Sequence, residues 1–246
     1  MRILVSNDDG YNSPGIQSLA QALSNIAEVD VVAPDCNRSA ASNSLTIYNP
    51  LRAYTADNGF VYVNGTPADC VHLALTGLLK VEPNLVVAGI NNGPNMGEDV
   101  LYSGTVGAAM EGRWLGFPAL AMSICAFEPQ HNEAAARVAC DLVQRLIDKP
   151  LPRDTILNVN VPDIPYEDIQ GMQVTRCGKR HRSEPVIQSQ DPRGRRLYWV
   201  GAPGTEADAG PGTDFYAIKQ GYVSVTPLKV DLTDRELMPV VEAWLA

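Results

Sequence analysis

The sequence predicts an α/β protein with one mostly parallel sheet and helices on both faces. Short apolar segments rich in β-branched residues alternate with segments whose apolar residues recur at helical spacing. Polar loops rich in Gly, Asn, Asp and Ser join the end of a strand to the start of the next helix. Repeated strand, loop and helix units of this kind favour a parallel sheet whose crossover helices cover it.

The first half of the chain contains three such units. Strands are expected at Ile3–Val5, Val29–Ala33 and Leu85–Ala88, with the end of a more exposed strand at Tyr62–Asn64. Helices are expected after Ser13-Pro14, after Thr66-Pro67 and after Ser103-Gly104-Thr105. Ser or Thr before the first turn can cap free N–H groups, and Pro at the first helical position has no N–H to leave unpaired.

The second half begins in the same way and then changes. A strand at 118–123, a helix at 133–147 and a strand at 156–161 continue the pattern, whereas Pro, Gly and Arg become frequent from about Asp163. We interpret strands around Val174 and Tyr198, on either side of the polar stretch Arg182–Arg196, as an extended hairpin arm. The sequence thus predicts a single domain over 1–246, with a core over about 1–162 and an arm and C-terminal segment over about 163–246.

The end of the chain predicts one further strand and a terminal helix. The strand is expected at Tyr222–Thr226, and Thr233–Glu236 has the pattern of a capping box that opens the helix. This helix carries an apolar stripe formed by Leu237, Val240, Val241, Trp244 and Leu245. A stripe of that strength must dock on its own subunit or on a neighbour.

Composition excludes several classes of protein. No stretch of the 246 residues is apolar over the roughly 18 positions that a membrane-spanning helix needs. The N-terminal segment lacks the regions of a signal peptide, so we expect a cytoplasmic protein with no membrane partner. A net charge of −9 opposes binding to nucleic-acid polymers. Five widely spaced cysteines, with no C-x-x-C pair, are expected to stay reduced.

Three loops at expected strand ends hold a high density of oxygen-bearing side chains. They are Asn7–Gly10 with Asp8 and Asp9, Pro34–Ser44 with Ser39 and Asn43, and Gly89–Gly97 with Asn91, Asn92 and Asn95. Ligands of open α/β sheets bind outside the carboxyl ends of the strands, so these loops should converge. Ordinary turns would explain each loop taken alone, because Asp-Gly and Gly-rich segments are common in turns.

The side chains of these loops indicate a divalent cation and a phosphate group. The adjacent carboxylates of Asp8 and Asp9 repel each other unless a cation or proton lies between them. Carboxylate, hydroxyl and amide oxygens favour Mg²⁺, Mn²⁺ or Ca²⁺ over zinc or copper. Ser103-Gly104-Thr105 at a helix start offers N–H groups and hydroxyls that suit a phosphate, although helix capping alone would also explain Ser103 or Thr105. The three histidines follow no metal-ligand pattern.

At these residues the chain closely resembles the SurE family of stationary-phase survival proteins, which act as 5′/3′-nucleotidases. The motifs that carry the resemblance are Val5–Gly10, Asn37–Ser39, Ala41–Ser44, Gly65–Pro67, Gly89–Asn91, Gly93–Asn95, Tyr102–Val106 and Ala108–Gly112. They occur in the family's order along the whole chain. Coincidence is therefore excluded in practice.

The resemblance implies a Rossmann-like core and a metal-dependent phosphomonoesterase. It implies hydrolysis of nucleoside 5′-monophosphates, and in some members of 3′-monophosphates and short polyphosphate. One Mg²⁺ or Mn²⁺ per subunit, or Ca²⁺ in a crystal, is implied with the ligands Asp8, Asp9, Ser39 and Asn91. Asn92 is chemically equivalent to Asn91, so that choice depends on motif alignment. Family members form dimers by exchanging C-terminal segments, and some pair into tetramers through the hairpin.

The mechanism that we expect is attack of a water on phosphorus, in line with the leaving nucleoside oxygen. Asp8 and Asp9 are the expected catalytic residues, and which of them orients the water is open. The residues expected to hold the phosphate and substrate are Asn43, Asn95, Ser103, Gly104 and Thr105. Two alternatives remain: a noncatalytic nucleotide-binding or regulatory protein, and a phosphatase that forms an aspartyl-phosphate on Asp8.

Overall fold

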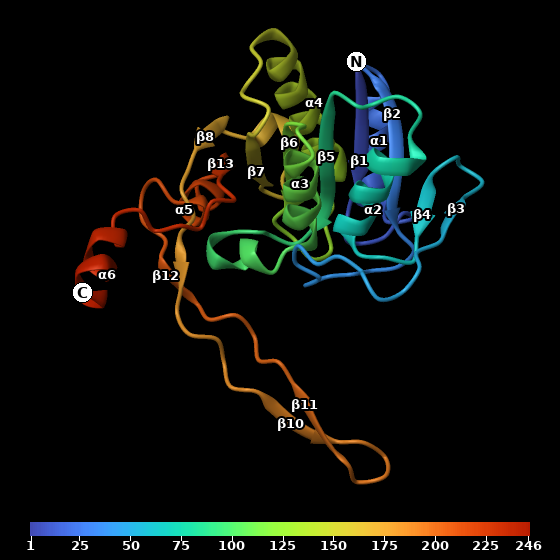
Figure 1. Cartoon of the computed structure of the whole chain (residues 1–246). Coiled ribbons are helices and arrows are strands. Elements are labelled where there is room, and N and C mark those ends of the chain that lie inside the picture. Colours follow the sequence, from blue (N-terminus) through green and yellow to red (C-terminus); the bar gives the residue numbers. More distant parts are fainter.

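A nine-stranded sheet forms the centre of the molecule. The computed structural model describes the backbone of residues 1–246 and every side chain except that of Trp114. The sheet has the order β3-β4-β2-β1-β5-β6-β7-β13-β8 (Figure 1). Its strands are β1 Arg2–Ser6, β2 Glu28–Pro34, β3 Ala53–Thr55, β4 Val61–Val63, β5 Leu85–Asn92, β6 Ala119–Ile124, β7 Ile156–Val161, β8 Met172–Val174 and β13 Val223–Leu228. Neighbours from β4 to β7 are parallel, which confirms the predicted fold class.

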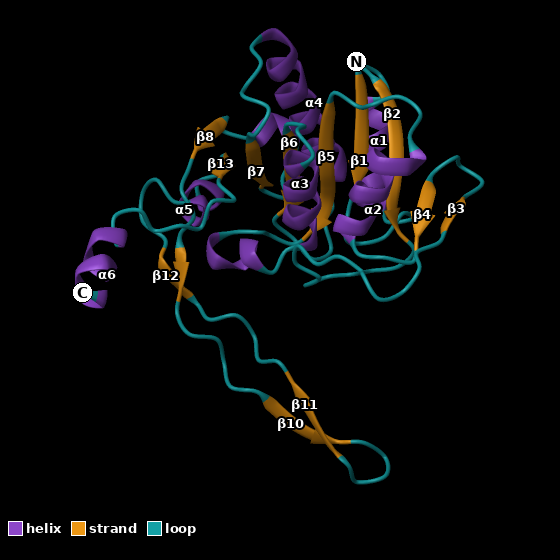
Figure 2. Ribbon diagram, in the orientation of Figure 1, coloured by secondary structure: helices purple, strands orange, loops and turns teal.

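Helices cover both faces of this sheet (Figure 2). They are α1 Pro14–Leu23, α2 Pro67–Leu73 continued by the π-helix η1 Ala74–Leu78, the 3₁₀-helix η2 Gly97–Leu101, α3 Gly104–Trp114, α4 Asn132–Asp148, the 3₁₀-helix η3 Tyr166–Asp168, α5 Asp214–Lys219 and α6 Met238–Leu245. Alternate residues of each strand face opposite layers. Ile3 and Val5 pack with α1 and α4, whereas Leu4 packs with α2 and α3. The sheet is therefore buried on both faces, as a parallel sheet with crossover helices requires.

The predicted helix starts lie where expected, although one of them is held in an unexpected way. Thr66 and Asp69 form a reciprocal capping box at α2. Ser13 occupies the position before α1, but its hydroxyl makes no capping bond and instead accepts from Asn7 Nδ2 at 2.8 Å. The start of α1 is thereby tied to the loop after β1.

β5 is longer than the sequence indicates. The expected strand ended at Ala88, whereas β5 continues to Asn92, and Asn91 and Asn92 pair with Ser123 and Ile124 of β6 after a shift in register. The Gly and Asn composition of this segment is typical of loops, and here the pairing with β6 overrides it. Asn91 is therefore fixed by backbone pairing within the sheet and does not belong to a loop.

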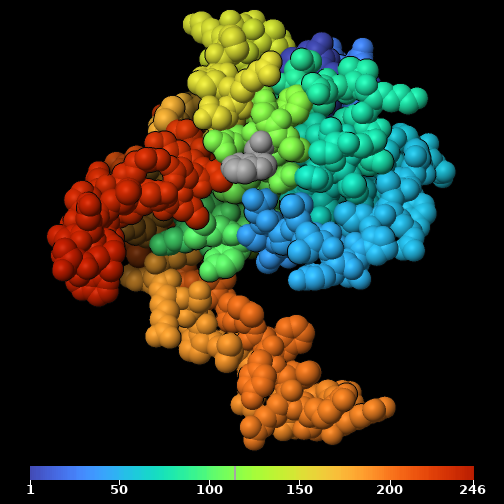
Figure 3. Space-filling model, viewed as in Figure 1, coloured from blue at the N-terminus to red at the C-terminus, as the bar shows by residue number. Residues whose placement is uncertain are grey.

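The arm is a hairpin that projects from the body as a thin extension (Figure 3). Its base pairs β9 Lys179–Arg180 with β12 Glu206–Asp208, and its tip pairs β10 Ile187–Gln190 with β11 Arg196–Trp199. The prediction that strands around Val174 and Tyr198 flank the polar stretch was wrong in one respect. Val174 belongs to β8, which pairs with β13 in the central sheet. The strand around Tyr198 is β11, and its partner is β10, which lies within the polar stretch.

The terminal helix α6 begins later than predicted, and none of its residues is buried in the chain that the structure describes. The capping box at Thr233–Glu236 is not formed, because the Asp234 carboxylate accepts the N–H groups of Glu236 and Leu237 at 3.1 and 3.0 Å. The helix then starts at Met238, and its apolar residues are exposed, with Trp244 at 81%. None of the helices in the described chain is long and apolar enough to span a membrane.

Candidate functional site

The loop after β1 presents Asp8 and Asp9 at the carboxyl end of the sheet. The buried Asn7 fixes this loop from within, since its Nδ2 donates to the Gly10 carbonyl oxygen at 3.0 Å and its Oδ1 accepts from the Gly10 N–H at 3.2 Å. Gly10 has a φ of 99°, which side chains rarely adopt. The loop is thus a turn, as an Asp-Gly pair can indicate. Its hydrogen bonds come from Asn7 and Gly10, so the carboxylates of Asp8 and Asp9 are not needed to form it.

Asp8 is held by the start of α3. It is 3% exposed, and its Oδ1 accepts from Thr105 Oγ1 at 2.6 Å. Gly104 lies so close that a β-carbon there would be 2.8 Å from Asp8 Cβ. Burial raises the pKa of Asp8, while hydrogen bonds from the Thr105 hydroxyl and from backbone N–H groups, including those of Thr105 and Gly104, lower it. The fold therefore fixes the Asp8 carboxylate in one orientation and shields it from solvent.

Asp9 is half-buried and held by two amide groups. Its Oδ2 accepts from the Asn92 N–H at 3.0 Å, and its Oδ1 accepts from Asn37 Nδ2 at 3.2 Å. Burial raises the pKa of Asp9 to about 6; the Asn92 bond lowers it and the charge of Asp8 raises it. Burial is the largest cause of both raised pKa values, and a cation beside the two carboxylates would favour their charged forms.

The second loop crosses the carboxyl end of β1. The Arg38 N–H donates to the backbone oxygen of Asp8 at 2.7 Å, which fixes the loop against the first one. Asn37 Oδ1 accepts from the N–H and the hydroxyl of Ser39 at 2.9 and 2.7 Å. Because that hydroxyl donates its proton to Asn37, its lone pairs stay available to a cation. Asn37 thus orients both Asp9 and Ser39.

The third segment brings two amides to the site. Asn91 is buried, and its Nδ2 donates to the Gly93 carbonyl oxygen at 2.8 Å, which directs the side-chain nitrogen away from any cation. Asn92 uses its backbone N–H for Asp9, and its own Oδ1 is buried without a partner among the described residues. Both amide oxygens therefore suit a cation, and these contacts do not choose between them.

The predicted phosphate-binding residues at α3 are partly engaged elsewhere. Ser103 Oγ caps the helix by accepting from the Val106 N–H at 3.0 Å. The hydroxyl of Thr105 is bonded to Asp8, as described above. Asn43 lies beside the helix, because a β-carbon on Gly107 would be 3.1 Å from Asn43 Cα. The capping interpretation of Ser103 is thus confirmed, while Thr105 contacts a carboxylate.

Asn95 lies in a buried amide network behind the site. Its N–H donates to Asn160 Oδ1 at 2.8 Å, its Nδ2 donates to Ser123 Oγ at 2.8 Å, and its carbonyl oxygen accepts from Asn158 and Asn160. At 7% exposure it joins the third loop to β6 and β7. These contacts describe a residue that supports the loop.

Sequence reasoning missed Asn37 and the asparagines of β7. Asn37 lies two residues before Ser39, a predicted metal ligand. An amide at that spacing in a tight loop can bond to the backbone and hydroxyl of the ligand residue, and this pattern was the available signal. Asn158 and Asn160 alternate in the otherwise apolar strand Ile156–Val161. Two amides on one face of a buried strand require partners, and this pattern could have predicted the network.

The donor set fits a divalent cation of the hard-oxygen type. Among the described residues, no group of three or more His, Cys, Asp or Glu side chains could hold a metal ion. The converging set instead combines two carboxylates with hydroxyl and amide oxygens. Mg²⁺ is bound by this combination of few carboxylates and neutral oxygens. Zinc and copper sites would use the sulfur and imidazole ligands that this set lacks.

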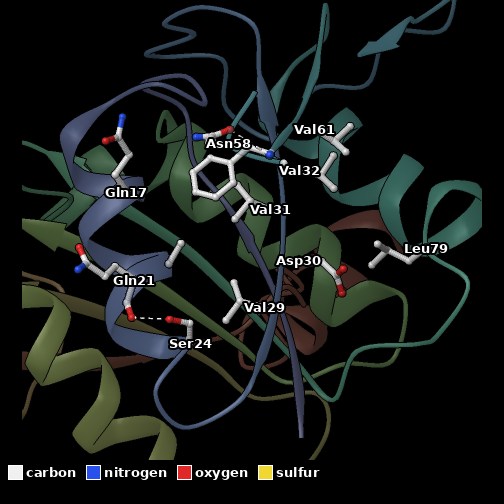
Figure 4. A pocket seen from close by; sticks show the side chains of 13 residues that line it. Gln17, Gln21, Ser24, Val29, Asp30, Val31, Val32, Asn58, Val61 and Leu79 are labelled. Atoms are coloured by element: carbon white, nitrogen blue, oxygen red, sulfur yellow. Dashed lines mark hydrogen bonds between the residues drawn. The ribbon is translucent and has the colours of Figure 1, made fainter. Parts of the chain in front are cut away.

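A different hollow lies along β2 and is separate from this set. It has a volume of about 440 Å³ and is lined by Gln17 of α1, Val31 of β2 and Asn58 of the β3–β4 turn, among others (Figure 4). None of its lining residues belongs to the predicted site. The convergence of the three loops, and not this hollow, marks the candidate site.

Comparison with known proteins gives one consistent result. The family model described as "Survival protein SurE" matches residues 3–184. The chain is 60% identical over 245 residues to the "5′-nucleotidase SurE" of Methylococcus capsulatus, with 100% of this chain and 98% of the relative covered. It is 58% identical over 246 residues to the "5′/3′-nucleotidase SurE" of Klebsiella pneumoniae, with 100% and 96% covered. The crystal structure of the SurE protein from Aquifex aeolicus superposes with a TM-score of 0.88 at 46% identity over the whole of both chains.

Proposed function

Because the chain belongs to the SurE family, we propose that it is a divalent-metal-dependent 5′-nucleotidase. It hydrolyses nucleoside 5′-monophosphates to nucleoside and phosphate, and we extend the proposal to 3′-monophosphates and short polyphosphate. The observation that carries the proposal is the arrangement of Asp8 and Asp9. Both carboxylates lie at the carboxyl end of β1, both have raised pKa values, and both are held by donors from other segments.

In this proposal Asp8, Asp9, Ser39 and Asn91 hold one Mg²⁺ or Mn²⁺. Such an ion supplies polarisation of a phosphoryl oxygen and a lowered pKa for bound water. Asn91 is preferred to Asn92 because it aligns with the family's motif.

The protein's own groups orient the reaction. Asp8 is 3% exposed and bonded to Thr105, whereas Asp9 is less buried, so we assign orientation of the attacking water to Asp9. Asn43 and the start of α3 at Ser103, Gly104 and Thr105 hold the phosphate in this proposal. The helix dipole at this start favours a negative charge there, and positioning with charge neutralisation supplies most of the rate.

The test is phosphate release from a panel of substrates. The panel contains 5′- and 3′-nucleoside monophosphates, an aryl phosphate and tripolyphosphate, each with Mg²⁺, Mn²⁺ or chelator. Metal-dependent release, highest for nucleoside monophosphates, is the expected result. Tight nucleotide binding without release under any metal would favour the noncatalytic alternative. A phosphorylated protein trapped by acid quenching would favour an aspartyl-phosphate on Asp8.

We also propose self-association through the last part of the chain. The domain then comprises a core over about 1–162 and an arm and oligomerisation segment over about 163–246, with dimers or tetramers formed through the latter. The exposed apolar face of α6, with Trp244 at 81% and Leu245 at 73%, supports this. We further propose that the protein works in the cytoplasm, since its five cysteines are free thiols, as in a reducing compartment.

A further inference from the structure

A cavity of about 280 Å³ opens beside the predicted phosphate-binding residues. Asn43 and Ser103 line one part of it. Apolar side chains from three segments line much of the remainder, namely Leu101 of η2, Met110 of α3, and Val230 and Leu232 after β13. Lys229 adds one cationic side chain to the lining. A concave site with apolar walls and a few polar groups at one end is the usual form of a small-molecule site.

The cavity and the predicted catalytic site share the start of α3. Ser103, Gly107 and Met110 follow each other at helical spacing and line the cavity from the start of α3 along one face. Gly104 and Thr105, on the neighbouring face, contact Asp8. A phosphate ester held at the start of α3 therefore has its phosphate near Asp8 and space for the rest of the molecule one turn further along.

Gly107 lets the second loop approach closely enough to form the wall of the cavity. A β-carbon on Gly107 would lie 2.4 Å from the backbone oxygen of Ser42, so any side chain there would displace the loop. The same loop is tied to the end of η2, because Ser42 donates its N–H to the Tyr102 oxygen at 3.1 Å and its hydroxyl to the Leu101 oxygen at 2.7 Å. The cavity is thus a built feature of the folded chain.

We propose that this cavity binds the nucleoside part of a nucleoside monophosphate. The base packs against Leu101, Met110 and Leu232, and the phosphate points to Asn43 and Ser103. This proposal rests on the proposed nucleotidase function and names the residues that distinguish a nucleotide from a simpler phosphate ester. Leu101, which lies outside the proposed oligomerisation segment, is 55% exposed, so apolar surface is left for a flat, weakly polar ligand to cover.

Phe127 is a second exposed side chain against which the base of a nucleotide could pack. Its ring is 83% exposed and lies 2.9 Å from where a β-carbon of Gly93 would be, near the amides of the third segment. It does not line the cavity described above, so it offers one face and no opposing wall. Phe127 is therefore the matched control: an exposed apolar side chain beside the site but outside the cavity.

The experiment compares the native protein with the double variant Leu101→Ala, Leu232→Ala and with Phe127→Ala. Both leucines are exposed, and the backbone bond of Leu101 to Ser42 does not depend on its side chain, so the double variant should fold. Steady-state rates are measured with a nucleoside 5′-monophosphate and with ribose 5-phosphate, which has no base. We expect KM for the nucleotide to rise about five- to tenfold in the double variant, from the lost apolar contact. KM for ribose 5-phosphate, and both KM values of Phe127→Ala, should stay within twofold.

Inhibition by free nucleoside gives a second readout. Adenosine should compete with ribose 5-phosphate in the native protein, and its inhibition constant should rise by the same factor in the double variant. An unchanged nucleotide KM in the double variant, or a larger rise in Phe127→Ala, would overturn the pocket assignment. If the native protein releases phosphate from no ester, the proposed nucleotidase function fails instead. Calorimetric binding of the nucleoside monophosphate to the same variants then tests the cavity on its own, with the same factor expected.

Discussion

The loops at the carboxyl ends of β1, β2 and β5 differ from the arm in how their residues are held. Asp8 and Asp9 bond to Thr105 and Asn92, which are 97 and 83 positions away in the sequence. At the tip of the arm, bonds join near neighbours, such as Asp191 with the N–H groups of Arg193 and Arg195. The loops of the site are held by hydrogen bonds to residues distant in the sequence, whereas the turn at the tip of the arm is held by hydrogen bonds between near neighbours.

Exposure of apolar side chains follows the same division. Leu4, Val5 and their neighbours below the site are fully buried, whereas Trp199 and Val200 of the arm are 62% and 91% exposed. A monomer gains little from apolar surface of this kind. The comparison shows that the geometry of the site is set by bonds within its own chain, whereas the apolar side chains at the tip of the arm stay exposed.

Among the variants that separate the site from the arm, Thr105→Val is expected to have the largest effect on kcat/KM. The substitution removes the hydroxyl that donates to Asp8 and keeps the volume of the side chain. Partners that orient a metal-binding or catalytic group contribute about 10- to 100-fold to affinity or activity, and we expect a loss of that size in kcat/KM. The matched control is Thr213→Val, which removes the hydroxyl that caps α5 near the base of the arm. That variant should lose about 1 kcal/mol of stability and keep its kcat/KM within twofold.

A smaller effect is expected where the base of the arm meets the site. The Arg180 guanidinium donates to Asp99 in η2 at 2.8 Å, and η2 leads directly to Tyr102 and Ser103. Arg180→Met should let η2 shift and raise KM for the nucleotide about threefold to fivefold, because a part-buried ion pair of this type contributes about 1 kcal/mol. Arg176→Met breaks an exposed pair with Asp208 at the same base and should leave KM unchanged. Equal effects of the two variants would contradict the assignment of η2 as the link.

Removal of the arm tip should change activity least and assembly most. Replacing residues 184–201 with a short Gly-Ser turn deletes β10 and β11 and leaves the base pairs of β9 with β12. We expect kcat/KM for an aryl phosphate within twofold of native, and a smaller assembly by sedimentation velocity. Loss of activity with an unchanged mass would show that the tip belongs to the site and not to a contact between chains.

The smallest effect is a pH-dependent gain in stability from Asp9→Asn in the metal-free protein. The pKa of Asp9 is raised to about 6 in the folded protein from its usual value of 3.8, so the folded state favours the protonated form. This contribution to stability is complete below pH 4 and is lost as the pH rises through 6. Because solvent screens a half-buried carboxylate, we expect Asn to stabilise the protein by only about 1 kcal/mol at pH 8 and by nothing at pH 4. Denaturant unfolding in chelator measures both values, and a loss of stability at pH 8 would contradict the physical account.

Much of the fold was predictable from local patterns. The alternation of apolar strands and helices predicted the parallel sheet, and Ser13, Thr66 and Ser103 marked three helix starts correctly. The limits of the arm and of α6 were not predictable, because short polar strands pair with each other through turn geometry and the Thr233 capping box competes with a local Asp234 turn. Such local choices differ by little free energy and leave a weak sequence signal.

The candidate site was predictable in composition but not in contacts. The carboxylates of Asp8 and Asp9 at a strand end predicted a cation site, and the loops do converge. The contact of Thr105 with Asp8 was not visible, because the two residues are far apart in sequence and no local pattern couples them. Asn95 was expected to bind the substrate, and that stays a prediction. Its contacts with β6 and β7 were not predicted, because they depend on a sheet register that sequence spacing does not specify.

Metal binding and phosphate release, measured on the same preparation, test the central claim most directly. The native protein should bind one Mn²⁺ per chain by equilibrium dialysis and should release phosphate from a nucleoside 5′-monophosphate only when the ion is present. In Asp9→Asn, both the bound Mn²⁺ and the release should be lost, while the thermal unfolding transition stays cooperative. Full metal-dependent turnover in Asp9→Asn, with unchanged Mn²⁺ binding, would contradict the account of the site.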